Sequence, residues 1–243
     1  MRNRTFDLFK WAAALFVLLL HVPFPGDVGG TVRMFARWAV PFFFMVSGYF
    51  TYGAVQREDA GRLLLVVPLV LGEVVVGMLH REVAAQYSRN AWFTGLPCFA
   101  LGLLFKEAET QIKRLGRKWP ALGVLVGLAL SVLEYRYLND SADLYLGPLV
   151  AAVSLFLLAQ NVTCTWENPF VLYAEGSALA IYILHPALRN LAQRQLLPWW
   201  GVRGMAADWL LPVLTLALAL LAAGIWLWLK GLWNQRKTRQ VTA

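Results

Sequence analysis

Long apolar runs alternate with short polar stretches along the chain, and this pattern predicts a series of long helices. An α-helix of about 20 apolar residues is long enough to cross a bilayer core of about 30 Å. The apolar runs cover residues 6–24, 34–54, 62–79, 91–105, 119–137, 144–160, 169–188 and 207–230. We therefore predict an all-α polytopic transmembrane helix bundle of about eight spans, forming one integral membrane domain over residues 1–243.

The composition supports a chain whose principal partner is the lipid bilayer. Hydrophobic residues make up 59% of the sequence and charged residues only 15%, against roughly 25% charged in soluble domains. The net charge of +8 would suit nucleic acid, but the basic residues fall between the apolar runs. That placement indicates membrane topology rather than a nucleic-acid surface. Nothing in the sequence predicts an oligomeric state.

The distribution of lysine and arginine predicts the orientation of the spans. With a cytoplasmic N-terminus, 14 of these residues lie in inner segments, 7 in outer segments, and Arg37 within a span. This bias places both chain termini in the cytoplasm, which an even number of spans requires. The stretch FKEAETQIKRLGRKW at 105–119 is the most basic internal loop and the clearest cytoplasmic marker.

Three polar residues in the first apolar run predict more than a lipid anchor. Lys10 and His21 are eleven positions apart, so they share one helix face and lie about 16 Å apart along the axis. Asp7 falls near the same line. Charged groups within a span are costly and indicate function, although Asp7 and Lys10 alone could also be a local ion pair near the interface.

Two further polar residues should lie at the depth of His21 in the outer half of the membrane. Arg37 is one turn inside the second span, and His185 ends the seventh span before Pro186. Imidazoles and a guanidinium at one level are suited to proton transfer and oxyanion stabilisation. His185 alone would suit an interfacial helix end, so the coincidence of depth carries the hypothesis. The three histidines lack carboxylates at ligand spacing, so no metal site is expected.

Four stretches, in order, resemble the acyltransferase family 3 membrane proteins. The family's first helix typically reads basic-Asn-x-x-x-Asp-x-x-basic, then ten residues and His, and Arg2, Asn3, Asp7, Lys10 and His21 match this spacing. The other stretches are VPFFFMVSGYF at 40–50, RNAWFTGLPCFALGLL at 89–104 and SALAIYILHPAL at 177–188.

The resemblance implies a bacterial inner-membrane enzyme that moves an acyl group, often acetyl, from cytoplasmic acyl-CoA to a hydroxyl acceptor. The acceptor would be a glycan, lipid or small molecule, commonly at the outer face. Lys10, with Asp7, would help to hold the acyl donor, and His21 would be the catalytic base or a transient acyl carrier. His185 and Arg37 would support it, with Arg37 stabilising the oxyanion.

The chain departs from the family pattern at two places, and other functions stay open. Lys10 stands where arginine is usual, and a lysine does not make the bidentate phosphate contact of arginine. About ten spans are usual, and the missing pair falls between Leu79 and Asn90. The main alternative is a small-molecule (amino-acid) transporter resembling the membrane domain of vancomycin-resistance serine racemases. Another is a shortened, inactive paralogue that binds a partner.

Overall fold

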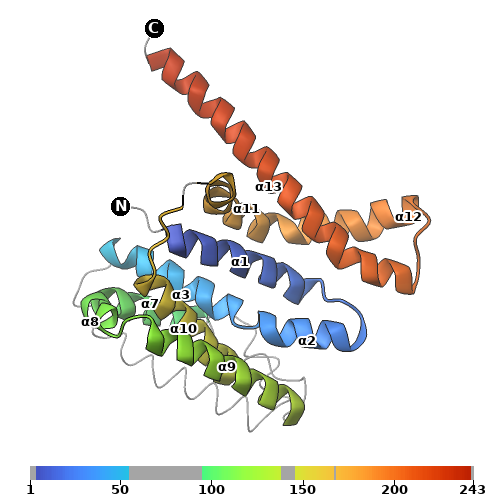
Figure 1. Ribbon diagram of the computed structural model, residues 1–243. Helices are drawn as coiled ribbons and strands as arrows, with labels where there is room; N and C mark the ends of the chain where they lie inside the picture. The colour runs from blue at the N-terminus through green and yellow to red at the C-terminus, as the bar shows by residue number, and fades with distance from the viewer. Residues whose placement is uncertain (1–3, 55–94, 138–145, 167, 242–243) are drawn as a thin grey trace. The chain divides into compact units, whose positions relative to one another are not determined.

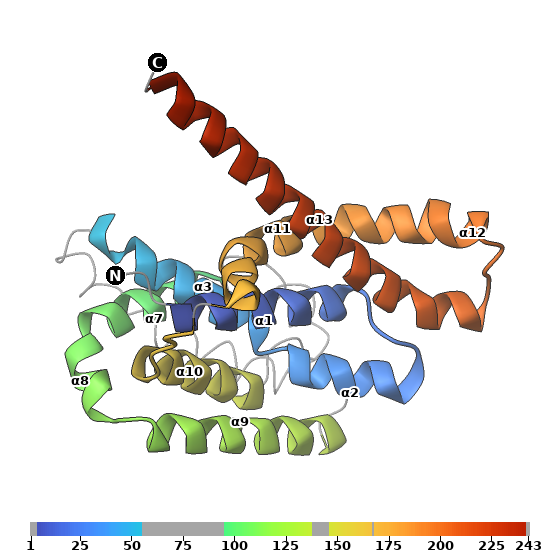
Figure 2. The same ribbon diagram turned by 45° about the horizontal axis from the view of Figure 1, so that its top comes forward.

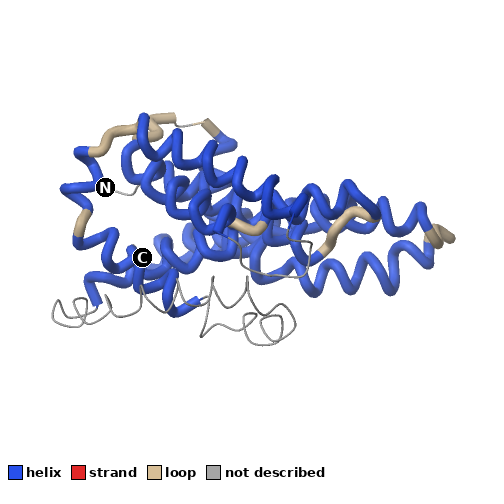
Figure 3. The backbone as a smooth tube through the Cα atoms, turned by 90° about the horizontal axis from the view of Figure 1, so that it is seen from below, coloured by secondary structure: helices blue, strands red, loops and turns tan. Residues whose placement is uncertain are grey.

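Every regular element in the described part of the chain is a helix, so the all-α prediction is confirmed there (Figures 1 and 3). The computed structural model describes residues 4–54, 95–137, 146–166 and 168–241. They fall into two compact units, one formed by residues 1–33 with 164–243 and the other by residues 34–163. Each unit is described by itself below, and the single-domain organisation stays a prediction.

Three long helices build the first unit: α1 (Arg4–His21), α11 (Pro169–Leu191) and α13 (Met205–Val241). Trp11, at the middle of α1, contacts Phe170 at the start of α11, and His21 at the end of α1 contacts His185 further along α11, so these two helices run parallel. The α11 helix continues through a π-helical turn (Ala192–Leu196) and the short α12 (Leu197–Trp199). The α13 helix then returns antiparallel, crossing α11 and extending past it (Figures 1 and 2).

Small residues allow these three helices to approach closely. Ala13 and Ala14 on α1, Ala174 on α11, and Ala219 and Ala223 on α13 have no exposed surface. Helix interfaces within a bilayer are enriched in small residues because association there depends on close van der Waals packing. The packing confirms that the first apolar run is a helix buried along one face.

The second unit contains α3 (Ala39–Thr51), α7 (Leu96–Glu107), α8 (Glu109–Arg114), α9 (Lys118–Tyr137) and α10 (Leu146–Asn161). In α3 and α7, two glycines meet reciprocally. A Cβ atom added to Gly48 would overlap the carbonyl group of Phe99, and one added to Gly102 would overlap that of Met45. Gly48 in the second apolar run therefore serves close packing.

Helices α9 and α10 pair in a similar way (Figure 2). A Cβ atom added to Gly127 would overlap the backbone of Ala151. The buried carboxylate of Glu134 accepts a hydrogen bond of 2.9 Å from the backbone N–H of Gly147. Because the first N–H groups of a helix lack intrahelical partners, this carboxylate caps α10.

The second predicted span, 34–54, is divided in the structure. Helix α2 (Gly26–Ala36) begins well before residue 34 and ends before a turn at residues 37–38, where α3 follows. Pro41 has no N–H to donate to the carbonyl of Arg37, so the helical ladder is interrupted at this point. The prediction of one continuous helical span over 34–54 is therefore wrong at residues 37–38.

Three helices in the described part of the chain are long and apolar enough to cross a membrane. They are Lys118–Tyr137, Pro169–Trp199 and Met205–Trp233, and they agree with three of the predicted spans. Leu146–Asn161 is a shorter apolar helix at the predicted 144–160 span. The predicted span at 62–79 and the start of that at 91–105 lie outside the described residues. The number of eight spans and the orientation of the termini stay predictions.

Candidate functional site

A polar pocket lies in the first unit, at the end where α1 finishes. It has a volume of about 480 Å³ and is lined by His21 of α1 and by residues of one stretch of α11, namely Tyr182, Ile183, His185, Pro186, Arg189 and Asn190. Two of the three histidines of the chain therefore share one cavity. This is the pairing expected from their equal predicted depth.

The two imidazole rings are stacked. Their centroids are 5.2 Å apart and their planes differ by 23°. His185 is only 4% exposed, whereas His21 is exposed. The buried His185 ring therefore packs against the exposed His21 ring, and His21 is the imidazole that a bound molecule would contact.

A proline sets the proton position on His185. In an α-helix the carbonyl of Tyr182 would accept from the N–H of residue 186, but Pro186 has none. The freed carbonyl lies 2.7 Å from Nδ1 of His185. A carbonyl oxygen only accepts, so Nδ1 must carry the proton and Nε2 of the neutral ring is then the acceptor. Pro186 thus fixes both the tautomer and the orientation of the ring.

Arg189 is a charged residue of this pocket that the sequence analysis did not select as a site residue. Its guanidinium interacts electrostatically with His21, as does that of Arg33 on α2. Its Nε atom is buried and has no hydrogen-bond partner among the residues that the structure describes. The signal was present in the sequence, because residue 189 follows His185 by four and so lies on the same helix face.

Arg37 lies in the second unit, at the turn between α2 and α3. Within that unit its charge interacts with the carboxylate of Glu134. The role predicted for Arg37 beside the histidines stays a prediction. Arg189 is the arginine that lines the pocket with both of them.

Asp7 and Lys10 in α1 form a local ion pair, which is one of the two possibilities that the sequence left open. The Lys10 ammonium lies 2.5 Å from the Asp7 carboxylate, and the side chain of Asp7 is only 3% exposed. A lysine ammonium carries three donor hydrogens, so one ion pair does not exhaust it. The role of Asp7 and Lys10 in holding an acyl donor stays a prediction.

A second polar cluster lies at the basic loop of the second unit. Glu109 is 2.5 Å from Lys106 and 2.6 Å from Lys113. Burial alone would raise the pKa of the Glu109 carboxyl, but hydrogen bonds from both lysines lower that pKa to about 2. Lys106 also lies 4.7 Å above the ring of Tyr49. This cluster ties α8 to α3 and α7, and its carboxylate stays charged at neutral pH.

The pocket at His21 has the parts needed for moving a proton to or from a bound hydroxyl group. It holds an accessible imidazole, a buried imidazole of fixed tautomer and a guanidinium. Among the residues described, no group of three or more histidine, cysteine or carboxylate side chains is placed to hold a metal ion. Such a set supports acid–base and electrostatic catalysis of group transfer.

Comparison with known proteins gives one match. Residues 3–87 match the family model of the acyltransferase domain of the acyltransferase-3 type, which is about a third of the chain. The match contains Asp7, Lys10, His21 and Arg37. No curated protein and no solved structure matches the chain. The matched domain supports an acyltransferase, and this short chain is consistent with a member of the acyltransferase-3 family.

Proposed function

We propose that the protein is an integral membrane O-acyltransferase that moves an acetyl or similar acyl group from acyl-CoA to a hydroxyl acceptor. The observation that carries this proposal is the stacked pair of His21 and His185 in a pocket that also contains Arg189. The family match supplies the reaction class. The pair gives that reaction a base on an exposed surface and a buried ring that orients it.

In the proposed reaction, His21 takes the proton from the acceptor hydroxyl as its oxygen attacks the thioester carbonyl. The tetrahedral oxyanion then collapses, breaking the carbon–sulfur bond. His21 returns its proton to the departing thiolate, so the products are an O-acyl ester and free CoA. A transient acyl group on His21 would divide the same balance into two steps.

The neighbouring groups have distinct parts in this scheme. His185 is a positioning residue, because its ring is held through Nδ1 by the Tyr182 carbonyl and packs against His21. Arg189 stabilises the oxyanion, since its guanidinium shares the pocket and acts on His21. A preorganised donor of this kind typically contributes 10²–10³-fold to such reactions. Arg37 is the other candidate for this part.

The donor is proposed to enter from the end of the unit at which α1 begins. Asp7 and Lys10 lie in the first half of α1, and Lys10 would contact the phosphates of CoA. His21 is eleven residues further along α1, about 16 Å away, and an extended pantetheine arm would span this distance. The scheme places the enzyme in the bacterial inner membrane, with a glycan, lipid or small-molecule acceptor at the outer face.

The test uses sealed membrane vesicles that contain the full chain and receive labelled acetyl-CoA on one face. Label is followed into extractable glycans and lipids for the native protein, His21→Ala and Arg194→Gln. Arg194 lies on the same continuous helix as Arg189 but is exposed and does not line the pocket, so its variant is the control.

Transfer by the native protein and Arg194→Gln, with loss in His21→Ala, is the expected result. A general base typically contributes 10²–10⁴-fold, so the loss should be at least about 100-fold. Equal transfer by His21→Ala and native protein would exclude His21 as the base. Absence of transfer in all three would count against acetyl transfer to the acceptors present.

A further inference from the structure

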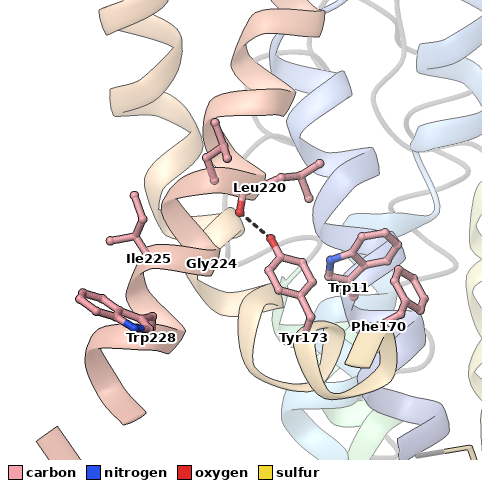
Figure 4. Close-up of a pocket in the computed structure, with 8 residues that line it drawn as sticks. Trp11, Phe170, Tyr173, Leu220, Gly224, Ile225 and Trp228 are labelled. Carbon is pink, nitrogen blue, oxygen red and sulfur yellow. Dashed lines mark hydrogen bonds between the residues drawn. The ribbon is translucent and has the colours of Figure 1, made fainter. Parts of the chain in front are cut away.

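An apolar groove lies in the first unit between the middle of α1, the first turns of α11 and the returning α13, away from the histidine pocket (Figure 4). Its volume is about 730 Å³. The residues that shape it are Trp11, Phe170, Tyr173, Leu220, Gly224 and Trp228. Unlike the histidine pocket, its walls are almost wholly hydrocarbon and aromatic surface.

The floor of the groove exists because Gly224 has no side chain. A Cβ atom added there would lie 3.8 Å from the ring of Tyr173, an ordinary van der Waals distance. The Tyr173 hydroxyl donates a 2.6 Å hydrogen bond to the carbonyl of Leu220, shown dashed in Figure 4. The one polar atom of that ring is therefore occupied within the protein, and the floor offers an apolar surface.

The open side of the groove is suited to contact with lipid. Both helices that form its long walls, α11 and α13, are long and apolar enough to cross a membrane. On the α13 side, Leu221, Ile225 and Trp228 are 65%, 58% and 64% exposed. A contiguous apolar surface of this kind on a membrane-spanning helix faces hydrocarbon chains rather than water.

One donor in the groove indicates what an occupant should carry. The indole nitrogen of Trp11 is buried, and it has no hydrogen-bond partner among the described residues. A buried donor without a partner is costly, so an occupant that brings an acceptor to this atom is favoured. Tryptophan is typical of the membrane interface, where the ester carbonyls of lipids lie. Leu220 lies eight residues from Trp228 on α13, so the groove extends for about 12 Å along this helix.

We propose that this groove binds one fatty-acyl chain of a glycerophospholipid from the leaflet in which α1 begins. The chain lies over Gly224 between Tyr173 and Trp228. Its ester carbonyl accepts a hydrogen bond from the Trp11 indole. This binding is separate from acyl transfer, and it holds whether or not the histidine pocket is catalytic.

The test is photo-crosslinking of the full-length protein in phosphatidylcholine vesicles that contain a trace of diacyl phosphatidylcholine with a diazirine on one acyl chain. Label on residues 220–228 of α13 is compared with label on α9, where Leu122 and Leu125 are exposed on a membrane-spanning helix. A specific site should favour the groove at least about fivefold. Equal labelling of both segments would mean lipid solvation only and would overturn the proposal.

Two variants of α13 make this comparison specific. Gly224→Leu fills the groove floor, and its Cβ atom would have only the Tyr173 ring within 4 Å, so labelling of the groove should fall to the level of α9. Gly231→Leu adds the same side chain where nothing lies within 4 Å and should keep the native ratio. An unchanged ratio in Gly224→Leu would contradict the site.

The hydrogen bond is tested independently with Trp11→Phe, which keeps the aromatic packing against Phe170 and removes the N–H group. The native protein should label less with a dialkyl ether probe, which lacks the ester carbonyl, than with the diacyl probe. In Trp11→Phe the two probes should label equally. A persistent preference for the ester in this variant would overturn the role of Trp11, even if Gly224→Leu did not fold.

Discussion

The two ends of the first unit are built from the same three-helix frame, yet one is polar and the other apolar. At the end of α1, Pro186 frees a carbonyl that fixes His185 beside His21. Near the start of α11, the Tyr173 hydroxyl donates a hydrogen bond to the carbonyl of Leu220, and Gly224 leaves a groove. This difference in polarity depends on the hydrogen-bond partner of one backbone carbonyl in each region, that of Tyr182 or that of Leu220. A carbonyl freed by proline orients a polar group, whereas the Leu220 carbonyl removes a polar group from the surface.

The largest effect after removal of the base should come from Arg189. Arg189→Gln should lower kcat for acetyl transfer about 100-fold, because one oxyanion donor typically contributes 10²–10³. Arg189→Lys should restore part of that loss, and Arg194→Gln should match the native protein. Initial rates in the vesicle assay measure this. A greater loss in Arg37→Gln than in Arg189→Gln would assign the oxyanion to Arg37 instead.

Replacing Pro186 should uncouple stability from activity at the polar end. In Pro186→Ala the new N–H competes with Nδ1 of His185 for the Tyr182 carbonyl, so we expect transfer to fall about tenfold. The melting temperature should stay unchanged or rise, because a proline inside a helix is unfavourable. Pro212→Ala, which changes a proline within α13, is the matched control. Loss of stability and activity together would indicate a merely structural role for Pro186.

At the opposite end, Lys10→Gln should act on donor binding rather than on chemistry. We expect KM for acetyl-CoA to rise about three- to tenfold with little change in kcat, since a single charge contact that water reaches is worth about 1 kcal/mol. Lys230→Gln removes an exposed lysine elsewhere in the unit and should leave KM unchanged. A fall in kcat alone would place Lys10 in the chemical step and remove the proposed division between the two ends.

The smallest functional effect should come from the second unit, where a strongly shifted carboxyl has no part in transfer. Because the pKa of Glu109 is lowered to about 2, its stabilisation is present above pH 4.5 and is lost as the pH falls toward 2. Glu109→Gln should therefore lower the free energy of unfolding at pH 7 by no more than about 3 kcal/mol, measured as a lower melting temperature. This difference from the native protein should shrink on acidification. Transfer at pH 7 should be unaffected, and a pH-independent difference in stability would contradict the ion-pair origin.

Much of the fold could be predicted from the sequence because long apolar runs leave few alternatives to membrane helices. The spans at 119–137 and 169–188 agree closely with α9 and α11, and the span at 207–230 lies within the longer α13. The break at residues 37–38 was missed because a proline perturbs the helix one turn before itself. Its consequence therefore lies away from the residue that a sequence pattern marks.

The site was predicted in part for a similar reason. Counting residues from the helix ends gave the common depth of His21 and His185, and the structure brings them together. Depth does not give the azimuthal direction of a side chain, so the same count did not separate Arg37 from other arginines. Arg189 was missed because it was counted as a topological charge beyond the span, although it lies one helical turn after His185.

The central claim is that His21 and His185 act as a unit, and a double-mutant cycle tests it most directly. Initial rates of acetyl transfer are measured for His21→Ala, His185→Ala and the double variant in the same vesicles. Residues that act together are strongly non-additive, so the double variant should be no slower than His21→Ala, with His185→Ala at least about tenfold below native. Independent, multiplicative losses, or a native rate in His185→Ala, would contradict the account.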